Sequence, residues 1–511
     1  MPQPDKDKQV SVPPRSRFRK LLRVFLLGGG LLFVFGGLLS IGAYLFWSYP
    51  AAMETRAELE KIRQEWGVGS LEEMNEFFDL PEGQEDLVPY LNKAWRQYST
   101  IRESFPDPDP TDAEEDSELE DYLSWPDIPQ VTAELNPASP NWGQVSTAEK
   151  FLKEFEEITR QVERMGEMEG GFRIPGDWAR GGVLGDGETS DIIFAMRDLH
   201  RILIAKNRMS LCKGDVEGAI EAAFAALSLI RGMDRTDVIY QMMRSSVLSA
   251  VLPSVVSTFP YMRDGELIKI QERLREIDFR SAWKRALVSE RVSAGCLIQQ
   301  GNHVILRNVY SMGGPLAKSF FGRVLLALGR PHDLARLYRN TNRFLDVFDR
   351  PWKEINRLLN APRFSSRRQL LRAGAIFETV LYYYSDYAYW ASPRMLSSMV
   401  FQIEVRVDVA LAAAAVERFR RKHGKLPGSL AELSPGYLPR AAPLETMKYV
   451  VGDKEYVVYS FGLDGEDDGG INFDGEVESL DDVAIRIPVG GSSTSPGPEP
   501  TPLRPENPSG A

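Results

Sequence analysis

Six aspartates lie within nineteen residues near the C-terminal end of the chain, in a segment that is also rich in glycine. They are Asp464, Asp467, Asp468, Asp474, Asp481 and Asp482. Hard cations such as Ca²⁺ bind about six to eight oxygens from carboxylates and backbone carbonyls, and glycines let the backbone wrap around the ion. Without a cation the clustered carboxylates would repel one another. The segment therefore predicts a calcium-binding loop, and a solvated acidic loop without an ion is the alternative.

Regular elements on both sides of this segment are expected to hold its ends. Residues 448–451 and 455–460 are β-rich and are joined by Gly452, Asp453 and Lys454, which predicts a hairpin. A last strand is expected at 483–487. Before the hairpin, apolar residues at helical spacing predict one long helix over 399–422. A short helix at 430–433 follows, where Ser429 and Glu432 have the spacing of a capping box.

This C-terminal part resembles the soluble head of the major pseudopilins of type II secretion. The resemblance lies in RFRRKHGKLPGSLAELSPGYLP, EYVVYSFGLDGEDDGG and DDVAIRIP, and it covers roughly the last hundred ordered residues. In that family the loop before the last strand binds calcium. By matching position, the resemblance implies calcium ligands at Asp464, Asp467, Asp468 and either Asp481 or Asp482.

The sequence gives only weak signals for catalytic sites, disulfides or other metal sites. The sequence has no Gly-x-Ser-x-Gly, His-x-x-x-His or His-Glu-x-x-His motif. Its two cysteines, Cys212 and Cys296, exclude a disulfide scaffold and a cysteine-rich zinc site. Because both fall in helical stretches, free and buried thiols are favoured over a single disulfide. No catalytic residue and no organic cofactor is therefore predicted.

The charge balance of the whole chain argues against nucleic acid as a partner. The 511 residues carry 61 Lys and Arg against 72 Asp and Glu, a formal net charge of −11. A general nucleic-acid-binding protein would be expected to be basic. With 43% hydrophobic residues, most of the chain can bury a core.

The N-terminal region predicts a membrane anchor. Residues 24–47 contain no charged side chain and are long enough to cross a bilayer. Basic residues crowd 1–23, and Tyr44, Trp47 and Tyr49 mark the far end. The positive-inside rule then places 1–23 in the cytoplasm and everything after the anchor outside. A cleaved signal peptide fits less well, since its apolar run would be shorter.

The part outside the membrane is expected to be mainly helical. We predict a helical segment over 48–145 with an acidic, proline-rich linker, a helical domain over 146–398, the pseudopilin-head-like module over 399–489 and a disordered tail over 490–511. The glycine-rich residues 166–188 predict a surface loop. Residues 214–227, GDVEGAIEAAFAAL, are typical of the second helix of a tetratricopeptide repeat, with Asp215 as its cap and an alanine stripe for close packing.

Residues 280–372 are strongly basic within this acidic chain. One interpretation is a set of solvated helix faces paired with acidic groups elsewhere. The other is docking on anionic lipid headgroups near the anchor.

The whole chain also resembles a group of membrane-anchored proteins of planctomycete-type bacteria that has no established activity. The similar parts are the anchor, SLEEMNEFF, FRIPGDW, KGDVEGAIEAAFAAL and the C-terminal module. The sequence thus predicts a mainly α protein with an N-terminal transmembrane helix, a helical extracytoplasmic domain and a small α+β C-terminal module. Its expected function is binding or scaffolding in the cell envelope with a protein partner. An extracytoplasmic hydrolase that uses acidic residues is the alternative.

Overall fold

The computed structural model describes most of the regions expected to be ordered. These are residues 35–38, 42, 44–103, 145–173, 187–235, 238–300, 393–438, 447–461, 466–470 and 482–489, with short runs between 331 and 355. The described chain is mainly helical and has a small three-stranded antiparallel sheet toward its C-terminus, which confirms this part of the predicted fold. The predicted acidic linker and the predicted C-terminal tail lie outside the described residues.

The chain divides into two compact units. The first comprises residues 1–61, 298–340 and 368–388, and the second comprises 62–297, 341–367 and 389–511. No described helix is both long and apolar enough to cross a membrane. Most of the predicted anchor, residues 24–47, lies outside the described part of the chain.

A π-helical turn, η1 (Tyr44–Ser48), leads directly into helix α2 (Tyr49–Trp66), whose residues up to 61 belong to the first unit. The Thr55 hydroxyl lies within hydrogen-bonding distance of two carbonyl oxygens, 2.8 Å from that of Ala51 and 2.9 Å from that of Pro331. Glu54 forms an ion pair with Arg339. These contacts fasten the helical residues around 331–339 to the first turns of α2.

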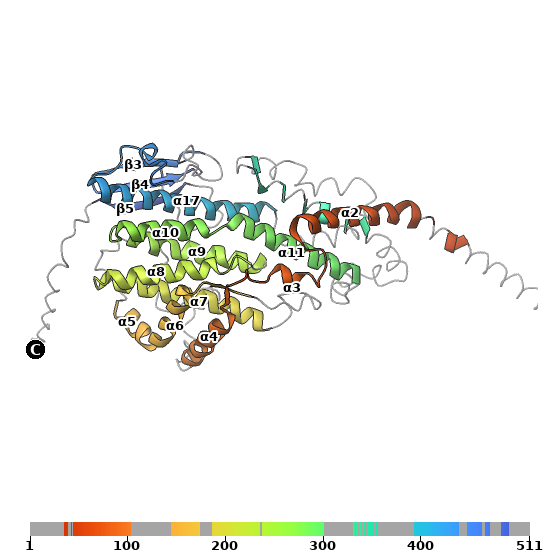
Figure 1. The fold of residues 1–511 in the computed structure, drawn as a ribbon, viewed down its shortest axis with the longest axis horizontal. Coiled ribbons are helices and arrows are strands. Elements are labelled where there is room, and N and C mark those ends of the chain that lie inside the picture. Colours follow the sequence, from red (N-terminus) through yellow and green to blue (C-terminus); the bar gives the residue numbers. More distant parts are fainter. Residues whose placement is uncertain are drawn as a thin grey trace, which may run out of the picture. The chain divides into compact units, whose positions relative to one another are not determined.

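The second unit is a stack of helices (Figure 1). Its elements before residue 300 are α3 (Met74–Phe77), β1 (Glu85–Asp86), α4 (Val88–Glu103), α5 (Val145–Glu154), α6 (Glu156–Glu167), β2 (Gly170–Gly171), α7 (Gly187–Cys212), α8 (Val216–Arg231), α9 (Val238–Thr258), α10 (Asp264–Glu276) and α11 (Phe279–Gln300). Helix α8 is central and packs against α6, α7, α9 and α10. Its alanine-rich sequence suits this place, because small side chains let several neighbouring helices approach closely.

Helix α8 begins and packs as its sequence predicts. Asp215 caps it by accepting a hydrogen bond from the Gly218 backbone N–H at 3.0 Å. The predicted alanine stripe is buried, and the stripe consists of Ala219, Ala223 and Ala226. Helix α6 approaches so closely that a Cβ on Gly166 would lie 2.5 Å from the Ala225 Cα.

The expectation of a surface loop over 166–188 is wrong for its first residues. Gly170 and Gly171 form β2, which pairs in parallel with β1, and both glycines and Phe172 are buried. The Phe172 N–H donates to the carbonyl of Gly232 at 3.0 Å, just beyond the end of α8. A run of glycine usually indicates exposed chain, but here it permits a close approach between backbone segments.

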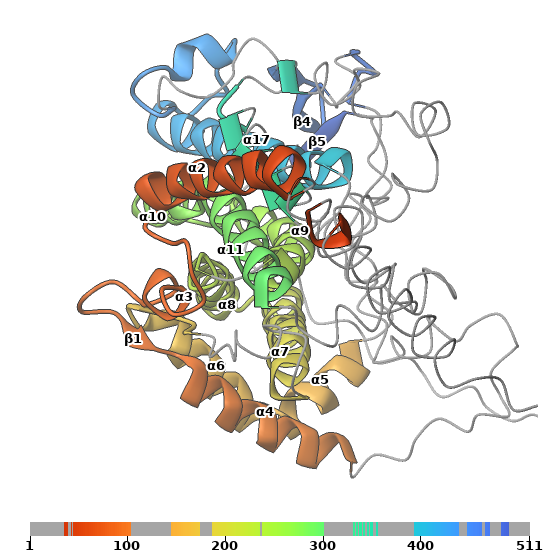
Figure 2. The same cartoon turned by 90° about the vertical axis from the view of Figure 1, so that its right-hand side faces the viewer.

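The long helix α17 (Pro393–His423) joins the helical stack to the C-terminal sheet. It packs against α9 and α10 and also against strands β4 (Glu455–Ser460) and β5 (Val483–Pro488). Figures 1 and 2 both show α17 between the sheet and these helices. Its alanine-rich middle is buried, as expected for a helix covered on two sides.

The sheet has the order β3-β4-β5 and is antiparallel throughout, with β3 at Met447–Val451. The predicted hairpin and last strand are therefore present.

The predicted capping box forms only in part at the short helix η5 (Leu430–Leu433). Ser429 makes no side-chain cap, while Glu432 accepts a hydrogen bond from the Gly428 N–H at 3.1 Å.

Candidate functional site

The acidic loop connects two neighbouring antiparallel strands, so the sheet holds both of its ends. Ser460, the last residue of β4, is paired with Val483, the first residue of β5. Within the loop, Gly469 and Gly470 have φ values of +75° and +67°. A Cβ on Gly470 would lie 3.0 Å from Cδ1 of the Tyr459 ring. Both the left-handed backbone and the close approach to Tyr459 therefore require glycine at position 470.

Asp467 is fixed to this glycine turn and to strand β4. Its Oδ1 accepts hydrogen bonds from the Gly469 N–H at 3.1 Å and from the Tyr459 hydroxyl at 3.0 Å. Partial burial and the hydrogen bond to Asp467 raise the pKa of Tyr459. The Tyr459 hydroxyl therefore stays a donor, and Asp467 keeps a defined position at the start of the turn.

Asp482 is unusual among the described loop residues because its side chain is completely buried. Its Oδ2 accepts a hydrogen bond from the Gly470 N–H at 2.9 Å. Its Oδ1 is also buried and has no hydrogen-bond partner among the described residues. An unpaired carboxylate oxygen in a buried place costs free energy unless a proton or a cation satisfies it.

The loop thus brings together some of the predicted ligands. Asp467 and Asp482 accept hydrogen bonds from the N–H groups of the consecutive residues Gly469 and Gly470. Asp468 lies between Asp467 and Gly469 in the chain. The other predicted ligands and loop aspartates, Asp464, Asp474 and Asp481, lie outside the described residues. The part of the chain that the structure describes contains no group of three side chains placed to bind a metal.

One arginine supplies positive charge at this end of the sheet. Arg486 on β5 donates from Nη2 to the carbonyl of Gly470 at 2.9 Å and from Nη1 to Glu455 at 2.9 Å. Its charge is therefore directed at the glycine turn and at β4. The unpaired Asp482 oxygen and the all-oxygen donor set fit a hard cation such as Ca²⁺.

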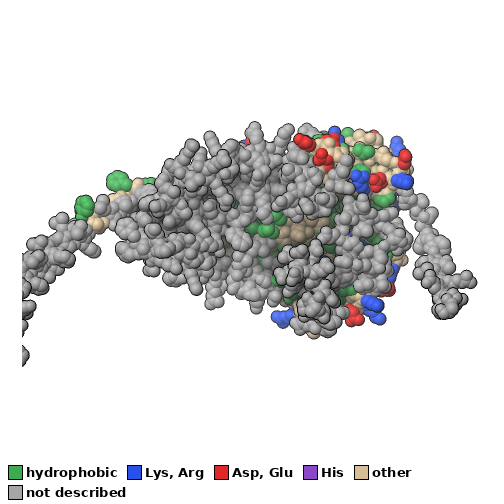
Figure 3. Space-filling view, turned by 180° about the vertical axis from the view of Figure 1, so that it is seen from behind, with side chains coloured by type: hydrophobic (Ala, Val, Ile, Leu, Met, Phe, Trp, Pro, Cys, Tyr) green, Lys and Arg blue, Asp and Glu red, His purple; other side chains and the backbone are tan. Residues whose placement is uncertain are grey.

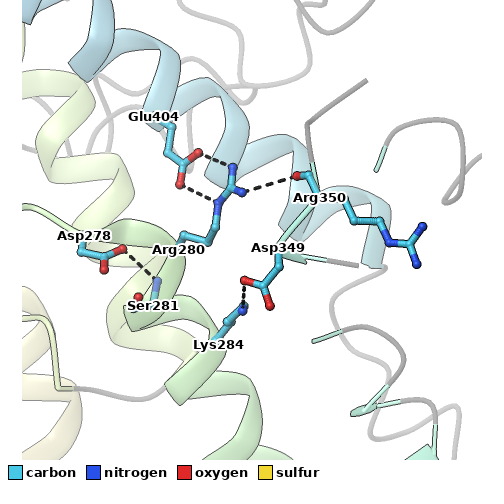
Figure 4. A network of polar contacts seen from close by, with 7 residues as sticks. All are labelled: Asp278, Arg280, Ser281, Lys284, Asp349, Arg350 and Glu404. Atoms are coloured by element: carbon cyan, nitrogen blue, oxygen red, sulfur yellow. Dashed lines mark hydrogen bonds and ion pairs between the residues drawn. The ribbon is translucent and has the colours of Figure 1, made fainter. Parts of the chain in front are cut away.

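A second polar cluster, which the sequence analysis did not identify, joins α11 to α17 (Figure 4). Arg280 donates to both carboxylate oxygens of Glu404, from Nη2 at 2.8 Å and from Nε at 3.2 Å. Lys284, one turn further along α11, forms an ion pair with Asp349. Asp278 caps α11 by accepting from the Ser281 N–H at 3.0 Å.

Asp408 lies one turn from Glu404 on α17. Burial and, after it, the charge of Glu404 raise the pKa of Asp408 to about 7 against the opposing effect of Arg280. Glu404, by contrast, has both oxygens bound by Arg280. Two carboxylates one turn apart, Glu404 and Asp408, in a helix whose neighbouring residues are mostly apolar were the sequence signal that could have identified this cluster.

Several of the described basic residues in 280–372 form ion pairs, as the paired-face interpretation expects for them. Arg280 binds Glu404, Lys284 binds Asp349 and Arg350 binds Glu354. For these residues, lipid headgroups are not needed as counter-charges.

The cysteines and histidines do not form a nucleophilic site within the described residues. Neither cysteine forms a disulfide, which agrees with the expectation of free thiols. Cys212 is exposed, so the prediction that it is buried is wrong. Cys296 is buried, and burial raises the pKa of its thiol. Burial lowers the pKa of His200 to about 4, which keeps this imidazole neutral.

Comparison with known proteins gives no family for the chain. No protein-family model matches it, and no curated protein and no solved structure is significantly similar to it.

Proposed function

We propose that the chain is a single-pass, membrane-anchored protein of the cell envelope that binds or scaffolds a protein partner outside the cytoplasm. A calcium ion stabilises its C-terminal module, which is related to the heads of pseudopilins. The buried, half-satisfied carboxylate of Asp482 is the observation that carries the calcium part of this proposal. The succession of long helix, hairpin, acidic loop and last strand supports the relationship to pseudopilin heads.

Exposed apolar side chains near the N-terminus support the anchor. Four large apolar residues in the described part of 24–47 are exposed, namely Phe35 (60%), Leu38 (62%), Leu45 (53%) and Phe46 (89%). In Figure 3 the hydrophobic side chains of this segment stand out in green at the left. Such a run of exposed apolar surface is favourable in a lipid bilayer and costly in water.

A reporter fusion tests the orientation of the anchor. A reporter that is active only outside the cytoplasm, fused after Ala511, should be active. An inactive fusion of this kind, together with an active cytoplasmic reporter at the same position, would overturn the proposed topology.

Calcium should bind through Asp467, Asp468 and Asp482, with Asp464 or Asp481 and backbone carbonyls completing the oxygen shell. When bound, the ion would supply the positive charge that the Asp482 Oδ1 lacks. Because binding to the folded state alone stabilises it, calcium should raise the melting temperature of the purified full-length chain.

The variant Asp482→Asn tests whether the Asp482 carboxylate is responsible for the effect of calcium. It keeps the size of the side chain, removes the charge that a cation requires, and should abolish the calcium-dependent rise. Asp453→Asn, in the exposed β3–β4 turn, removes the same charge elsewhere in the module and should leave the rise intact. The calcium site is excluded if millimolar calcium leaves the melting curve of the folded parent unchanged.

The helix pair α7–α8, whose second helix resembles that of a tetratricopeptide repeat in sequence, supports the binding role. Affinity purification from membranes should recover a partner with the full chain but not with a control that ends after α2. Equal recovery with the two baits would contradict the binding role.

A hydrolase is the second candidate, favoured by the Asp408–Glu404 pair. A carboxyl group with a pKa near 7 exchanges its proton near neutral pH, as a general acid or base must, and Glu404 places a second carboxyl group one turn away. A broad hydrolase screen on the purified chain, repeated with Asp408→Asn, tests this function. Activity that survives the substitution would exclude this pair as its source.

A further inference from the structure

The outer face of the C-terminal sheet, which is the face turned away from α17, carries Tyr459 and Arg486. Side chains alternate between the two faces along a strand. On β4 the Tyr456 hydroxyl donates to Glu417 of α17 at 2.9 Å, so Tyr459, three residues further on, belongs to the opposite face. Arg486 on β5 pairs with Val457 and therefore shares the face of Tyr459.

The glycine turn of the acidic loop folds back onto this outer face. A Cβ on Gly470 would lie 3.0 Å from the Tyr459 ring. The Gly470 carbonyl accepts a hydrogen bond from Arg486 Nη2 at 2.9 Å, and the Gly470 N–H donates to Asp482 Oδ2 at 2.9 Å. Both backbone polar groups of this glycine are thus held by side chains of β5 and of the residue just before it.

Arg486 is itself held in place on the sheet. Its Nη1 donates to Glu455 of β4 at 2.9 Å, and its side chain is 29% exposed. The guanidinium group therefore bridges strand β4 and the glycine turn. A planar guanidinium group holds two acceptors at once in a fixed geometry, which the compact ammonium group of a lysine does not reproduce.

The turn in turn orients the buried carboxylate of Asp482. Oδ2 of Asp482 is fixed by the Gly470 N–H, and its buried Oδ1 has no hydrogen-bond partner among the described residues. The direction of Oδ1, the oxygen that a cation would satisfy, therefore depends on where Gly470 lies, and Arg486 fixes Gly470 from its other side. Groups that orient a metal ligand without touching the metal typically change the affinity by about 10–100-fold.

We propose that Arg486 is a positioning residue of the cation site in the acidic loop. Through Gly470 it keeps the Asp482 carboxylate and the glycine turn in the conformation that binds the ion, so that less ordering is needed on binding. This role rests on the calcium site proposed above.

The sign of the effect separates this role from simple electrostatics. A positive charge close to a cation site repels the ion, so Coulomb's law alone predicts that removing Arg486 tightens calcium binding. A positioning role predicts the opposite, because the loss of the bond to Gly470 releases the turn that orients Asp482.

Calcium titration of the purified full-length chain by isothermal calorimetry measures this sign. Arg486→Gln should raise the dissociation constant for calcium by about 10–100-fold. Arg486→Lys, which keeps the charge but loses the two-point geometry, should raise it by a smaller factor. Lys454→Gln is the matched control: it removes a positive charge from the exposed β3–β4 turn of the same module and should leave the dissociation constant unchanged.

Hydrogen exchange in calcium-free buffer tests the positioning without the ion. Mass spectrometry should show faster exchange in Arg486→Gln than in the parent for the peptide that contains Gly469 and Gly470. The same peptide should exchange at the parental rate in Lys454→Gln.

The outcomes distinguish this role from the calcium site itself. A parent chain that binds no calcium overturns both. If the parent binds calcium, the role of Arg486 alone is overturned when folded Arg486→Gln binds calcium as tightly as the parent or more tightly, or when exchange of the turn is unchanged. If Arg486→Gln does not fold, Arg486→Lys is held to the same criteria.

Discussion

Arg280 on α11 binds Glu404 on α17 through two hydrogen bonds, although 124 residues separate them in the chain (Figure 4). The two side chains are 27% and 24% exposed, so water screens the pair only in part. Planar, two-point geometry of this kind makes an arginine–carboxylate pair stronger than a single contact between point charges. The pair therefore fixes the register of α17 against the helical stack and, through α17, the position of the C-terminal sheet.

Removing one member of this pair should destabilise the chain. We expect Arg280→Gln to cost about 1–3 kcal/mol of unfolding free energy, because Glu404 loses two charged hydrogen bonds. In a double-mutant cycle with Glu404→Gln, measured by denaturant unfolding, the coupling energy should be about 0.5–3 kcal/mol.

The exposed pair Arg160–Glu156 on α6 is the control for that cycle. Its side chains are 64% and 67% exposed, so the coupling should be below about 0.5 kcal/mol. Equal coupling energies in the two cycles would show that the two-point contact between α11 and α17 stabilises the chain no more than an exposed ion pair does.

Asp408 should make the stability depend on pH. Its pKa is raised from 3.8 to about 7 in the folded chain, so folding favours its protonated form. The stabilising contribution is fully present below about pH 3.8 and is lost as the pH rises through about 7. Asp408→Asn should therefore melt at a higher temperature than the parent at pH 8, and the difference should vanish near pH 4. A difference that is constant from pH 4 to 8 would contradict the raised pKa.

The glycine turn of the acidic loop should tolerate no side chain at position 470. Gly470→Ala places a Cβ on a left-handed backbone and 3.0 Å from the Tyr459 ring, so it should cost about 1–3 kcal/mol. Gly265→Ala in α10 should have the opposite sign and stabilise by up to about 1 kcal/mol, since its Cβ meets no atom within 4 Å. Melting temperatures of the two variants measure this contrast, and destabilisation of similar size in both would refute it.

Local patterns explain why much of the fold was predictable. The cap at Asp215, the alanine stripe of α8 and the β-rich runs on both sides of Gly452 each depend on residues close together in the chain. Helix caps, helical periodicity and hairpin turns are set by such neighbours. The acidic loop could be located for the same reason, because both strands that hold it adjoin it in sequence.

The remaining features depend on contacts between distant segments. Glycines 170 and 171 have the composition of a loop and become a buried strand only because Glu85 and Asp86 pair with them. Arg244 and Glu417 are polar residue types whose burial no local pattern shows, since it is fixed by the helices and strands that cover them. Tertiary packing therefore decides which charged residues lie inside.

The contact between Glu417 and Tyr456 links α17 to the sheet and gives the last prediction. Glu417 is completely buried; its Oε1 accepts from the Tyr456 hydroxyl at 2.9 Å, and its Oε2 accepts from Arg420 at 2.6 Å. Burial and the neighbouring Glu417 raise the pKa of Tyr456 well above its ordinary value, so the hydroxyl remains a donor. Tyr456→Phe removes that donor but preserves the ring.

The Glu417 oxygen would then be left buried without its partner, at an expected cost of about 1–3 kcal/mol in denaturant unfolding. Tyr261→Phe is the control, because this tyrosine is 39% exposed and its loss should change the stability by less than about 0.5 kcal/mol. If the penalty comes from the unpaired carboxylate, then Glu417→Gln in the Tyr456→Phe background should cost less than it does in the parent. Fully additive losses in that cycle would mean that the Tyr456 hydroxyl does not support the buried charge.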